Sequence, residues 1–327
     1  MAISEKQEIL LESGTNELEI IEFYVGSQPL GINVQKLKEI IPFDESVLTA
    51  IPGSQPAMLG TLLLRGAIIP LIDLKTHLNQ RAQEHMNNNS RPVVMVCEFN
   101  HRTNGFKIDG VNQIHRVSWN DVEPIAPIIN QYKPRFTGTI HIDNREILIL
   151  DLEHIVGEFD PDSVIGEFDE PNIAGTGESS LSFRKQAKIL MAEDSTIIRT
   201  GIEKVLLEAG FEGLEVFVDG EACYQRILQL KKQAEESGDD IRKHLSLVIS
   251  DIEMPRMDGL TLCRKVKEGL GYKHVPVLLF SSLINPPMEV KCDSVEADGY
   301  AAKPEIAKLI AMMDQFIEQG VKETNPN

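Results

Sequence analysis

A change of pattern near the middle of the chain divides its 327 residues into two halves. From about Glu17 to Val156, short β-branched or alternating segments are broken by Gly, Pro, Asn and Asp, which is typical of a small all-β architecture. Beyond Arg184, short apolar strands alternate with helical patterns, which predicts a parallel sheet covered by helices on both faces. Because the two patterns require different architectures, we expect two domains.

The segment between the halves predicts a linker. It is rich in Gly, Asp, Glu, Pro and Ser and has no periodic apolar face, so we expect a flexible acidic connection over residues 157–184. The predicted organisation is an N-terminal tail over 1–16, an all-β domain over 17–156, the linker, an α/β domain over 185–320 and a C-terminal tail over 321–327.

Composition narrows the classes of partner. A formal net charge of −18, with no basic stripe, disfavours binding to nucleic acid and to anionic lipid. The N-terminus does not read as a signal peptide, and no segment has the apolar length of a membrane span, so we expect a cytoplasmic protein without direct membrane insertion. The four cysteines form no CxxC pair, so neither a zinc site nor a disulfide framework is indicated.

Polar residues follow four of the five predicted strands in the C-terminal half. Glu193 and Asp194 follow the first strand, Asp251 the third, Ser281 ends the fourth and Lys303 follows the fifth. Since the carboxyl ends of parallel strands share one edge of the sheet, three carboxylates, a hydroxyl and an ammonium are expected to converge there.

This set of groups suits phosphoryl transfer. Clustered carboxylates require a compensating cation, and Mg²⁺ accepts a few carboxylates with backbone oxygen and water. Asp251 could then attack phosphorus while Lys303 and Ser281 stabilise charge on the transferred group. Any one acidic residue at a strand end is more commonly a helix cap or a solvated loop charge. The joint occurrence, with the motif over residues 251–260 and Lys303-Pro304, favours a phosphoryl-acceptor site.

On these residues, the segment from Lys185 to about Gly320 resembles the receiver domain of two-component response regulators. The resemblance implies a CheY-like, doubly wound α/β fold with a five-stranded parallel sheet in the order 2-1-3-4-5. It also implies a domain that catalyses its own phosphorylation and is not usually counted as an enzyme.

The resemblance assigns a role to each matching position. The implied roles are Asp251 as the aspartyl-phosphate acceptor, Glu193 and Asp194 as metal ligands with Asp251, Glu253 as a backbone-carbonyl ligand, Ser281 as the switch hydroxyl, Lys303 as the lysine that completes the site, and Tyr300 as the aromatic switch residue. Tyr300 has an equally good alternative, because a tyrosine beside a buried strand is commonly a packing residue with its hydroxyl at the surface.

The N-terminal half shows almost no catalytic chemistry. Its histidines are scattered without metal-ligand spacing, and no nucleophile lies in a recognisable elbow, so a binding module is the default interpretation. The segments Tyr24–Val34, Leu59–Leu74, Gly105–Val111 and Ile147–Leu152 resemble the CheW coupling family. That resemblance covers about residues 17–156 and implies two small SH3-like five-stranded barrels.

Arg65 is the one residue of this half to which the resemblance gives a contact role. In the CheW family the Leu-Arg-Gly turn lies near surfaces that join chemoreceptors to the histidine kinase CheA. Two structural alternatives are that Arg65 only closes a turn or that it pairs with Asp73.

A CheW-like domain followed by a receiver is similar to the arrangement of the CheV family over essentially the whole chain. The resemblance implies a chemotaxis adaptor that couples methyl-accepting chemotaxis receptors to CheA in chemoreceptor arrays, regulated by phosphorylation of Asp251. Two alternatives stay open. The receiver could act as a phosphate sink that draws phosphoryl groups from CheA, or the protein could be a constitutive structural adaptor with an inert receiver.

Overall fold

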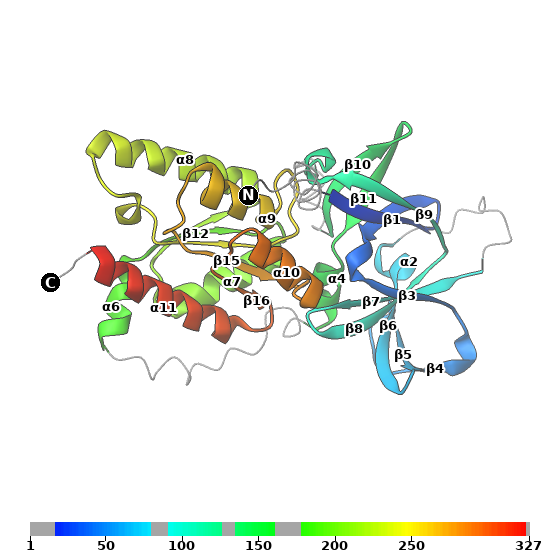
Figure 1. Cartoon of the computed structure of the whole chain (residues 1–327). Helices are drawn as coiled ribbons and strands as arrows, with labels where there is room; N and C mark the ends of the chain where they lie inside the picture. Colours follow the sequence, from blue (N-terminus) through cyan, green and yellow to red (C-terminus); the bar gives the residue numbers. More distant parts are fainter. Residues whose placement is uncertain (1–16, 80–90, 126–134, 161–177, 325–327) are drawn as a thin grey trace. The chain divides into compact units, whose positions relative to one another are not determined.

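The computed structural model describes residues 17–79, 91–125, 135–160 and 178–324 (Figure 1). Contacts divide the chain into two compact units. We call Leu18–Ser118 with Gly138–Leu150 the β unit, and we call the unit that includes Trp119–Thr137 and Asp151–Asn327 the α/β unit.

Two sheets make up the β unit. The first has five strands in the order β10-β11-β2-β1-β9, and the second has six in the order β3-β7-β8-β6-β5-β4. The strands are β1 (Glu17–Val25), β2 (Gln28–Asn33), β3 (Leu37–Pro42), β4 (Leu48–Thr49), β5 (Met58–Leu64), β6 (Ala67–Asp73), β7 (Val93–Phe99), β8 (Arg102–Ile108), β9 (Gly110–Ser118), β10 (Phe136–Ile142) and β11 (Arg145–Leu150). Three short helical segments join them: η1 (Val34–Lys36), η2 (Glu45–Val47) and α2 (Leu74–His77).

The burial pattern of each strand reflects its place in the sheet. β3 lies at an edge and alternates half-buried with exposed residues, as a strand with one solvated face should. Interior strand β7 is buried over most of its length. The predicted all-β N-terminal half with two lobes is confirmed, and the second sheet has one strand more than predicted because the two-residue β4 pairs with β5 at its edge.

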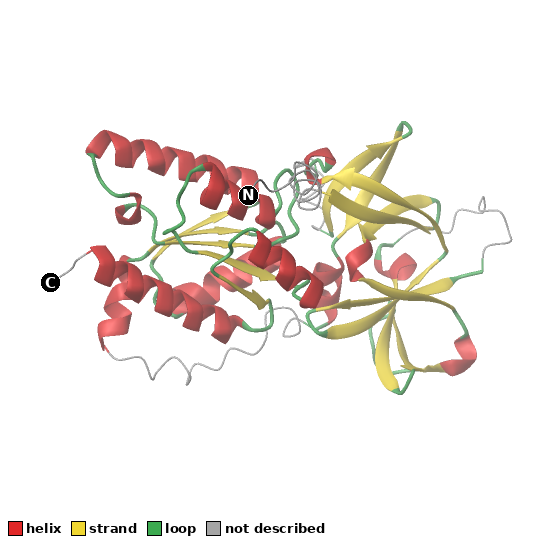
Figure 2. Ribbon diagram, in the orientation of Figure 1, coloured by secondary structure: helices red, strands yellow, loops and turns green. Residues whose placement is uncertain are grey.

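The α/β unit contains one parallel sheet in the order β13-β12-β14-β15-β16, with helices on both faces (Figure 2). Its strands are β12 (Lys188–Ala192), β13 (Gly213–Phe217), β14 (Leu247–Ser250), β15 (Val277–Ser281) and β16 (Gly299–Ala302). Its longer helices are α4 (Leu152–Phe159), α6 (Glu178–Gln186), α7 (Thr196–Glu208), α8 (Gly220–Ser237), α9 (Gly259–Arg264), α10 (Pro286–Ser294) and α11 (Ile306–Thr324), and its short turns are η3 (Trp119–Asp121), η5 (Ile241–Lys243) and the π-helical η6 (Lys265–Gly269). The predicted order 2-1-3-4-5 is confirmed.

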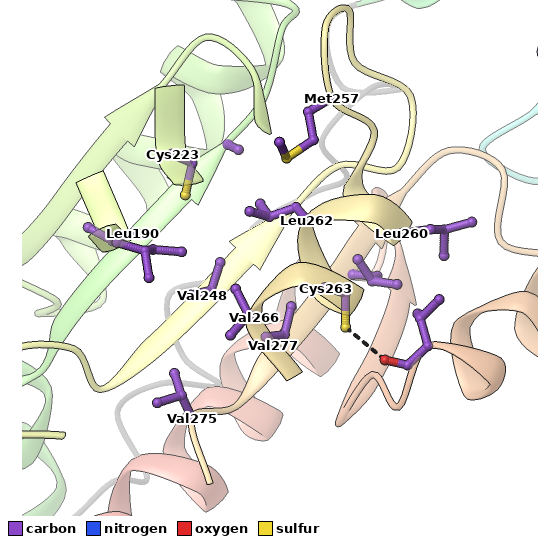
Figure 3. Close-up of a cluster of buried hydrophobic side chains, with 14 of the residues drawn as sticks. Leu190, Cys223, Val248, Met257, Leu260, Leu262, Cys263, Val266, Val275 and Val277 are labelled. Carbon is purple, nitrogen blue, oxygen red and sulfur yellow. Dashed lines mark hydrogen bonds between the residues drawn. The ribbon is translucent and has the colours of Figure 1, made fainter. Parts of the chain in front are cut away.

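Two apolar cores hold the helices to the sheet. Leu190 of β12 packs with residues of α8, α9 and α10 on one face, where Figure 3 shows Cys263 donating to the carbonyl of Val295. Ile189, the preceding residue, packs with α7 and α11 on the other face. Every residue of β14 and β15 is buried, which explains why these strands read as continuous apolar runs.

Local sequence signals determine where the helices begin and end. Asp219 caps α8 by accepting from the backbone N–H of Ala222, and Gly238 ends that helix in the left-handed conformation. Asn285 caps α10 and precedes Pro286, whose missing N–H is tolerated in the first turn of a helix.

The segment predicted as a flexible linker differs from the structure at both ends. Gly157–Phe159 belong to α4, and residues 178–184 belong to α6, while residues 161–177 lie outside the described part of the chain. Arg184 of α6 is buried and forms a two-pronged ion pair with Asp314 of α11. α4 belongs to the α/β unit, although sequence reasoning placed most of it in the N-terminal domain.

Gly259 provides a test of packing beneath the strand ends. A Cβ atom there would lie 2.0 Å from the carbonyl oxygen of Asp251. We expect Gly259→Ala to lower the stability of the α/β unit by about 2 kcal/mol. Gly269→Ala is the matched control, since a Cβ at that exposed position meets nothing within 4 Å. Urea unfolding followed by the fluorescence of Trp119, the chain's single tryptophan, measures both, and equal midpoints would contradict the expectation.

Candidate phosphoryl-acceptor site

The carboxyl edge of the parallel sheet brings the predicted site residues together. Glu193 and Asp194 follow β12, Asp251 follows β14, Ser281 ends β15, and Lys303 follows β16. β12 lies where the strand order reverses, and loops at such a point diverge and leave room for a site.

Lys303 is the centre of the cluster. Its buried Nζ lies 3.0 Å from Oδ2 of Asp251, 3.2 Å from Glu193 and 3.3 Å from Oε2 of Glu153. Burial acts to lower the pKa of Lys303, but the surrounding carboxylates, with Asp251 the largest contributor, outweigh it and raise this pKa well above its usual value. The lysine is therefore a fixed positive charge at the acceptor.

The carboxylates outnumber this single ammonium. Oxygen atoms of Glu193, Asp194 and Asp251 lie within 4.8 Å of one another. Burial, with repulsion from neighbouring carboxylates, raises the pKa of Asp194 well above its usual range and raises that of Glu193 to about 8, although Lys303 opposes the second shift. A divalent cation would relieve this repulsion.

The donor set fits Mg²⁺. All three groups supply hard oxygen ligands, which this ion prefers. Oδ2 of Asp194 is buried, and within residues 17–79, 91–125, 135–160 and 178–324 no group forms a hydrogen bond to it. A buried carboxylate oxygen without a donor is costly, and a metal ion would supply the missing partner.

Backbone contacts hold the acceptor loops in place. The N–H of Ile252 donates to Oδ1 of Asp251 at 2.6 Å. Arg199 of α7 donates to the backbone carbonyls of Glu193 and Asp194 at 2.8 and 3.1 Å, which fixes the loop that carries the acidic pair. Sequence reasoning did not identify Arg199, although an Arg one turn into the following helix is well placed to reach such a loop.

Ser281 and its neighbour Ser282 have different contacts. Ser281 is fully buried, and its Oγ accepts from the N–H of Leu283 at 3.4 Å. The hydroxyl of Ser282 donates to Oε1 of Glu153 at 2.5 Å. Sequence reasoning missed both residues. Glu153 lies 129 residues before Ser282 in the chain, in a segment without a phosphoryl-transfer motif, and Ser282 gains its role only through contact with Glu153.

Two further predicted positions lie near the cluster. Tyr300 of β16 is half-buried against the apolar core, a location consistent with both the packing and the switching interpretations. Glu253 is half-buried two residues beyond Asp251, and its role as a carbonyl ligand stays a prediction.

Arg65 lies in a tight turn between β5 and β6 of the β unit. Arg65 and Gly66 both have positive φ, 51° and 89°, as a two-residue hairpin turn requires. The Arg65 side chain is 78% exposed and donates to Oε2 of Glu39 at 2.8 Å. The predicted turn is present, but the alternative pairing with Asp73 is wrong, because Arg65 pairs with Glu39 instead. The Asp73 carboxylate lies 3.4 Å from Lys107.

Comparison with known proteins defines the class of this protein. Residues 19–159 match the CheW-like domain family, and residues 189–314 match the response regulator receiver domain family. The scaffolding protein TtCheW of Thermoanaerobacter tengcongensis is a similar solved structure, 23% identical, with a TM-score of 0.37 over 41% of this chain and 84% of that one. The two family matches show that the protein combines a CheW-like domain with a receiver domain.

Relatives that span both domains identify the family. Chemotaxis protein CheV3 of Helicobacter pylori is 31% identical over 93% of this chain and 96% of its own length. Chemotaxis protein CheV2 of the same organism is 26% identical over 89% of this chain and 90% of its own length. The chain belongs to the CheV family of chemotaxis proteins. In the described ranges, no helix is both long and apolar enough to cross a bilayer.

Asp258, which follows the acceptor loop, should make the stability of the folded protein depend on pH. It caps α9 by accepting from the N–H of Thr261 at 2.9 Å, and burial raises its pKa to about 6 from an ordinary value near 3.8. The folded protein thus holds this proton at pH values where the unfolded chain has lost it, so ionisation destabilises the folded state. Relative to Asp258→Asn, which keeps a capping oxygen, the wild type should lose up to about 3 kcal/mol of stability between about pH 4 and pH 6.

Chemical unfolding of both proteins across this pH range measures the difference. A difference in unfolding free energy that does not change with pH would show that Asp258 titrates normally in the folded protein.

Proposed function

We propose that this protein is a chemotaxis adaptor that couples methyl-accepting chemoreceptors to the histidine kinase CheA, and that phosphorylation of Asp251 regulates the coupling. The observation that carries the proposal is the cluster at the sheet edge. Asp251 and Glu193 pair with the buried ammonium of Lys303, and Asp194 offers an oxygen within 4.8 Å of both carboxylates. The membership of the chain in the CheV family supplies the chemotaxis context.

In the proposed reaction, an oxygen of Asp251 attacks the phosphorus of a phosphohistidine on CheA. The new O–P bond forms as the P–N bond breaks, and the imidazole leaves with the electron pair of that bond and takes a proton from solvent. Lys303 stabilises charge on the transferred oxygens, and the hydroxyl of Ser281 donates to one of them. The receiver thus catalyses its own modification, with the phosphohistidine of CheA as the phosphoryl donor.

Glu193, Asp194, Asp251 and the backbone carbonyl of Glu253 are the groups that would hold Mg²⁺. When bound, the ion would neutralise negative charge between the acceptor and the incoming phosphoryl group. The buried oxygen of Asp194 that no described donor reaches supports this assignment.

The β5–β6 turn is the proposed contact surface of the β unit. Leu63 and Ile68 lie opposite each other on the two strands and are 69% and 73% exposed. Next to them, Arg65 presents a charge that can orient a partner. Exposed apolar side chains beside an arginine are typical of surfaces that bind protein.

The two alternative functions predict different outcomes. If the receiver is a phosphate sink, phosphorylation of Asp251 should leave the affinity of the β unit for its partners unchanged. If the protein is a constitutive adaptor, Asp251 should accept no phosphoryl group. The buried cluster of acidic residues around Lys303 favours an active receiver over an inert one.

Transfer from autophosphorylated CheA tests the proposed acceptor. With Mg²⁺, radiolabel should appear on the wild type and be lost in Asp251→Ala, because the substitution removes the proposed acceptor carboxylate. Excess EDTA should also abolish transfer. Receptor-dependent kinase activity should change when the wild type is labelled and stay constant for the variant. Absence of label on the wild type would refute the regulatory part of the proposal.

Arg65→Asn tests the proposed contact surface. Asparagine tolerates the positive φ of this turn, so the substitution removes the charge with little backbone strain. We expect binding to receptor membranes carrying CheA to weaken by about fivefold or more. Arg116→Asn is the control, since Arg116 is 83% exposed and forms a similar pair with Glu19. Equal effects in a cosedimentation assay would show that Arg65 has no specific role.

A further inference from the structure

A carboxylate from α4 occupies the phosphoryl-acceptor site. Glu153 is only 3% exposed, and it accepts from Ser282 Oγ at 2.5 Å and from Lys303 Nζ at 3.3 Å. Both partners belong to the sheet edge that carries Asp251. α4 lies in the same compact unit as that sheet, so these contacts are internal to the α/β unit.

Contacts at both ends of α4 fix the position of Glu153. Asp151 caps α4 by accepting from the N–H of His154 at 2.8 Å. At the other end, Glu158 forms a two-pronged pair with Arg135, at 3.0 and 2.9 Å. Leu152, Ile155 and Val156 are also buried. Because the apolar residues and both ends hold the helix, the buried carboxylate of Glu153 has a defined position.

Glu153 contacts the cation that a phosphoryl group would need. An ammonium has three N–H donors, and Lys303 has three carboxylate partners: Asp251, Glu193 and Glu153. Phosphorylation would replace the single negative charge of the Asp251 carboxylate with a phosphoryl group that carries up to about two, and it would place strong acceptor oxygens beside this ammonium. Since Glu153 already uses one donor and is itself an anion in a buried site, the two groups would compete and repel each other.

We propose that Glu153 is an internal inhibitor of phosphorylation at Asp251, and that docking of α4 and phosphorylation of Asp251 exclude each other. This inference rests on the proposed function of Asp251 as the acceptor. Because the coupling is thermodynamically reciprocal, docking of α4 makes phosphorylation of Asp251 less favourable, and phosphorylation makes docking of α4 less favourable. Docked α4 also slows the reaction, since Glu153 occupies a donor of Lys303 that the transferred group would need.

The connectivity of the chain gives the release a direct consequence. α4 follows β11 after the single residue Asp151, and β11 is a strand of the CheW-like domain that pairs with β2 in parallel. Movement of α4 would therefore act through one residue on the end of a strand of the coupling domain. No separate output domain is needed for such a signal.

Labelling of the full-length protein by acetyl phosphate at saturating Mg²⁺ tests the inhibition. Removing the buried, hydrogen-bonded charge of Glu153 should favour phosphorylation of Asp251. Glu153→Gln and Glu153→Ala should therefore be labelled at Asp251 about tenfold faster than the wild type. Ser282→Ala, which removes the hydroxyl that donates to Glu153, should change the rate in the same direction. Glu236→Gln, which removes an exposed carboxylate of α8 paired with Lys232, should react like the wild type.

Equal rates for the wild type, Glu153→Gln and Ser282→Ala would overturn the inhibition and leave the proposed function intact. Absence of label on all variants, with Asp251→Ala as the blank, would instead overturn the proposed acceptor role and the inference with it.

Hydrogen exchange of the α4 amides tests the release of the helix independently of the labelling rate. In the wild type, phosphorylation should accelerate exchange over Leu152–Phe159 and leave the interior strand β14 protected. A helix whose exchange is unchanged in the phosphorylated protein would show that docking and phosphorylation are compatible, and would refute the proposal.

Discussion

The ion pairs of Lys303 are the interaction on which the α/β unit depends at its functional edge. The ammonium lies 3.0 Å from Asp251 and 3.2 Å from Glu193, and all three side chains are buried. Burial and repulsion between carboxylates raise the pKa of Glu193, and Lys303 opposes this shift. An ionised carboxylate is a better nucleophile and a better metal ligand than a neutral one. Charges interact more strongly in a buried site than in water, so the site is sensitive to any charge added to it or removed from it.

That sensitivity gives a physical basis for regulation. A receiver needs two states that differ in free energy when one phosphoryl group is added, and the charge balance around Lys303 provides such a difference. The carboxylate of Glu153 has the same sign as the phosphoryl group and shares its cation, so α4 is a candidate for the element that responds. The sequence places this helix directly after the last strand of the CheW-like domain.

The cluster of site residues at the sheet edge could be predicted from the periodic pattern of apolar residues. The alternation of apolar strands with helices determines a parallel sheet, and the sheet places Asp194, Asp251 and Lys303 at one edge because all its strands run in the same direction. The chemical roles of these residues still depend on the labelling experiments. For Arg65, the sequence predicted the turn but not the partner, since Glu39 reaches the arginine only through the folding of distant strands.

By itself, the sequence determined the two architectures and the residues that end the parallel strands, which follow from local periodicity and from the geometry that every parallel sheet shares. The order of those strands was implied by the resemblance to receiver domains. Only the tertiary structure decided that α4 packs with the α/β unit and that Glu153 reaches Lys303, 150 residues further along the chain. The helical pattern of α4 shows which of its residues are apolar, but the surface that buries them is chosen by packing between distant segments, which no local pattern records.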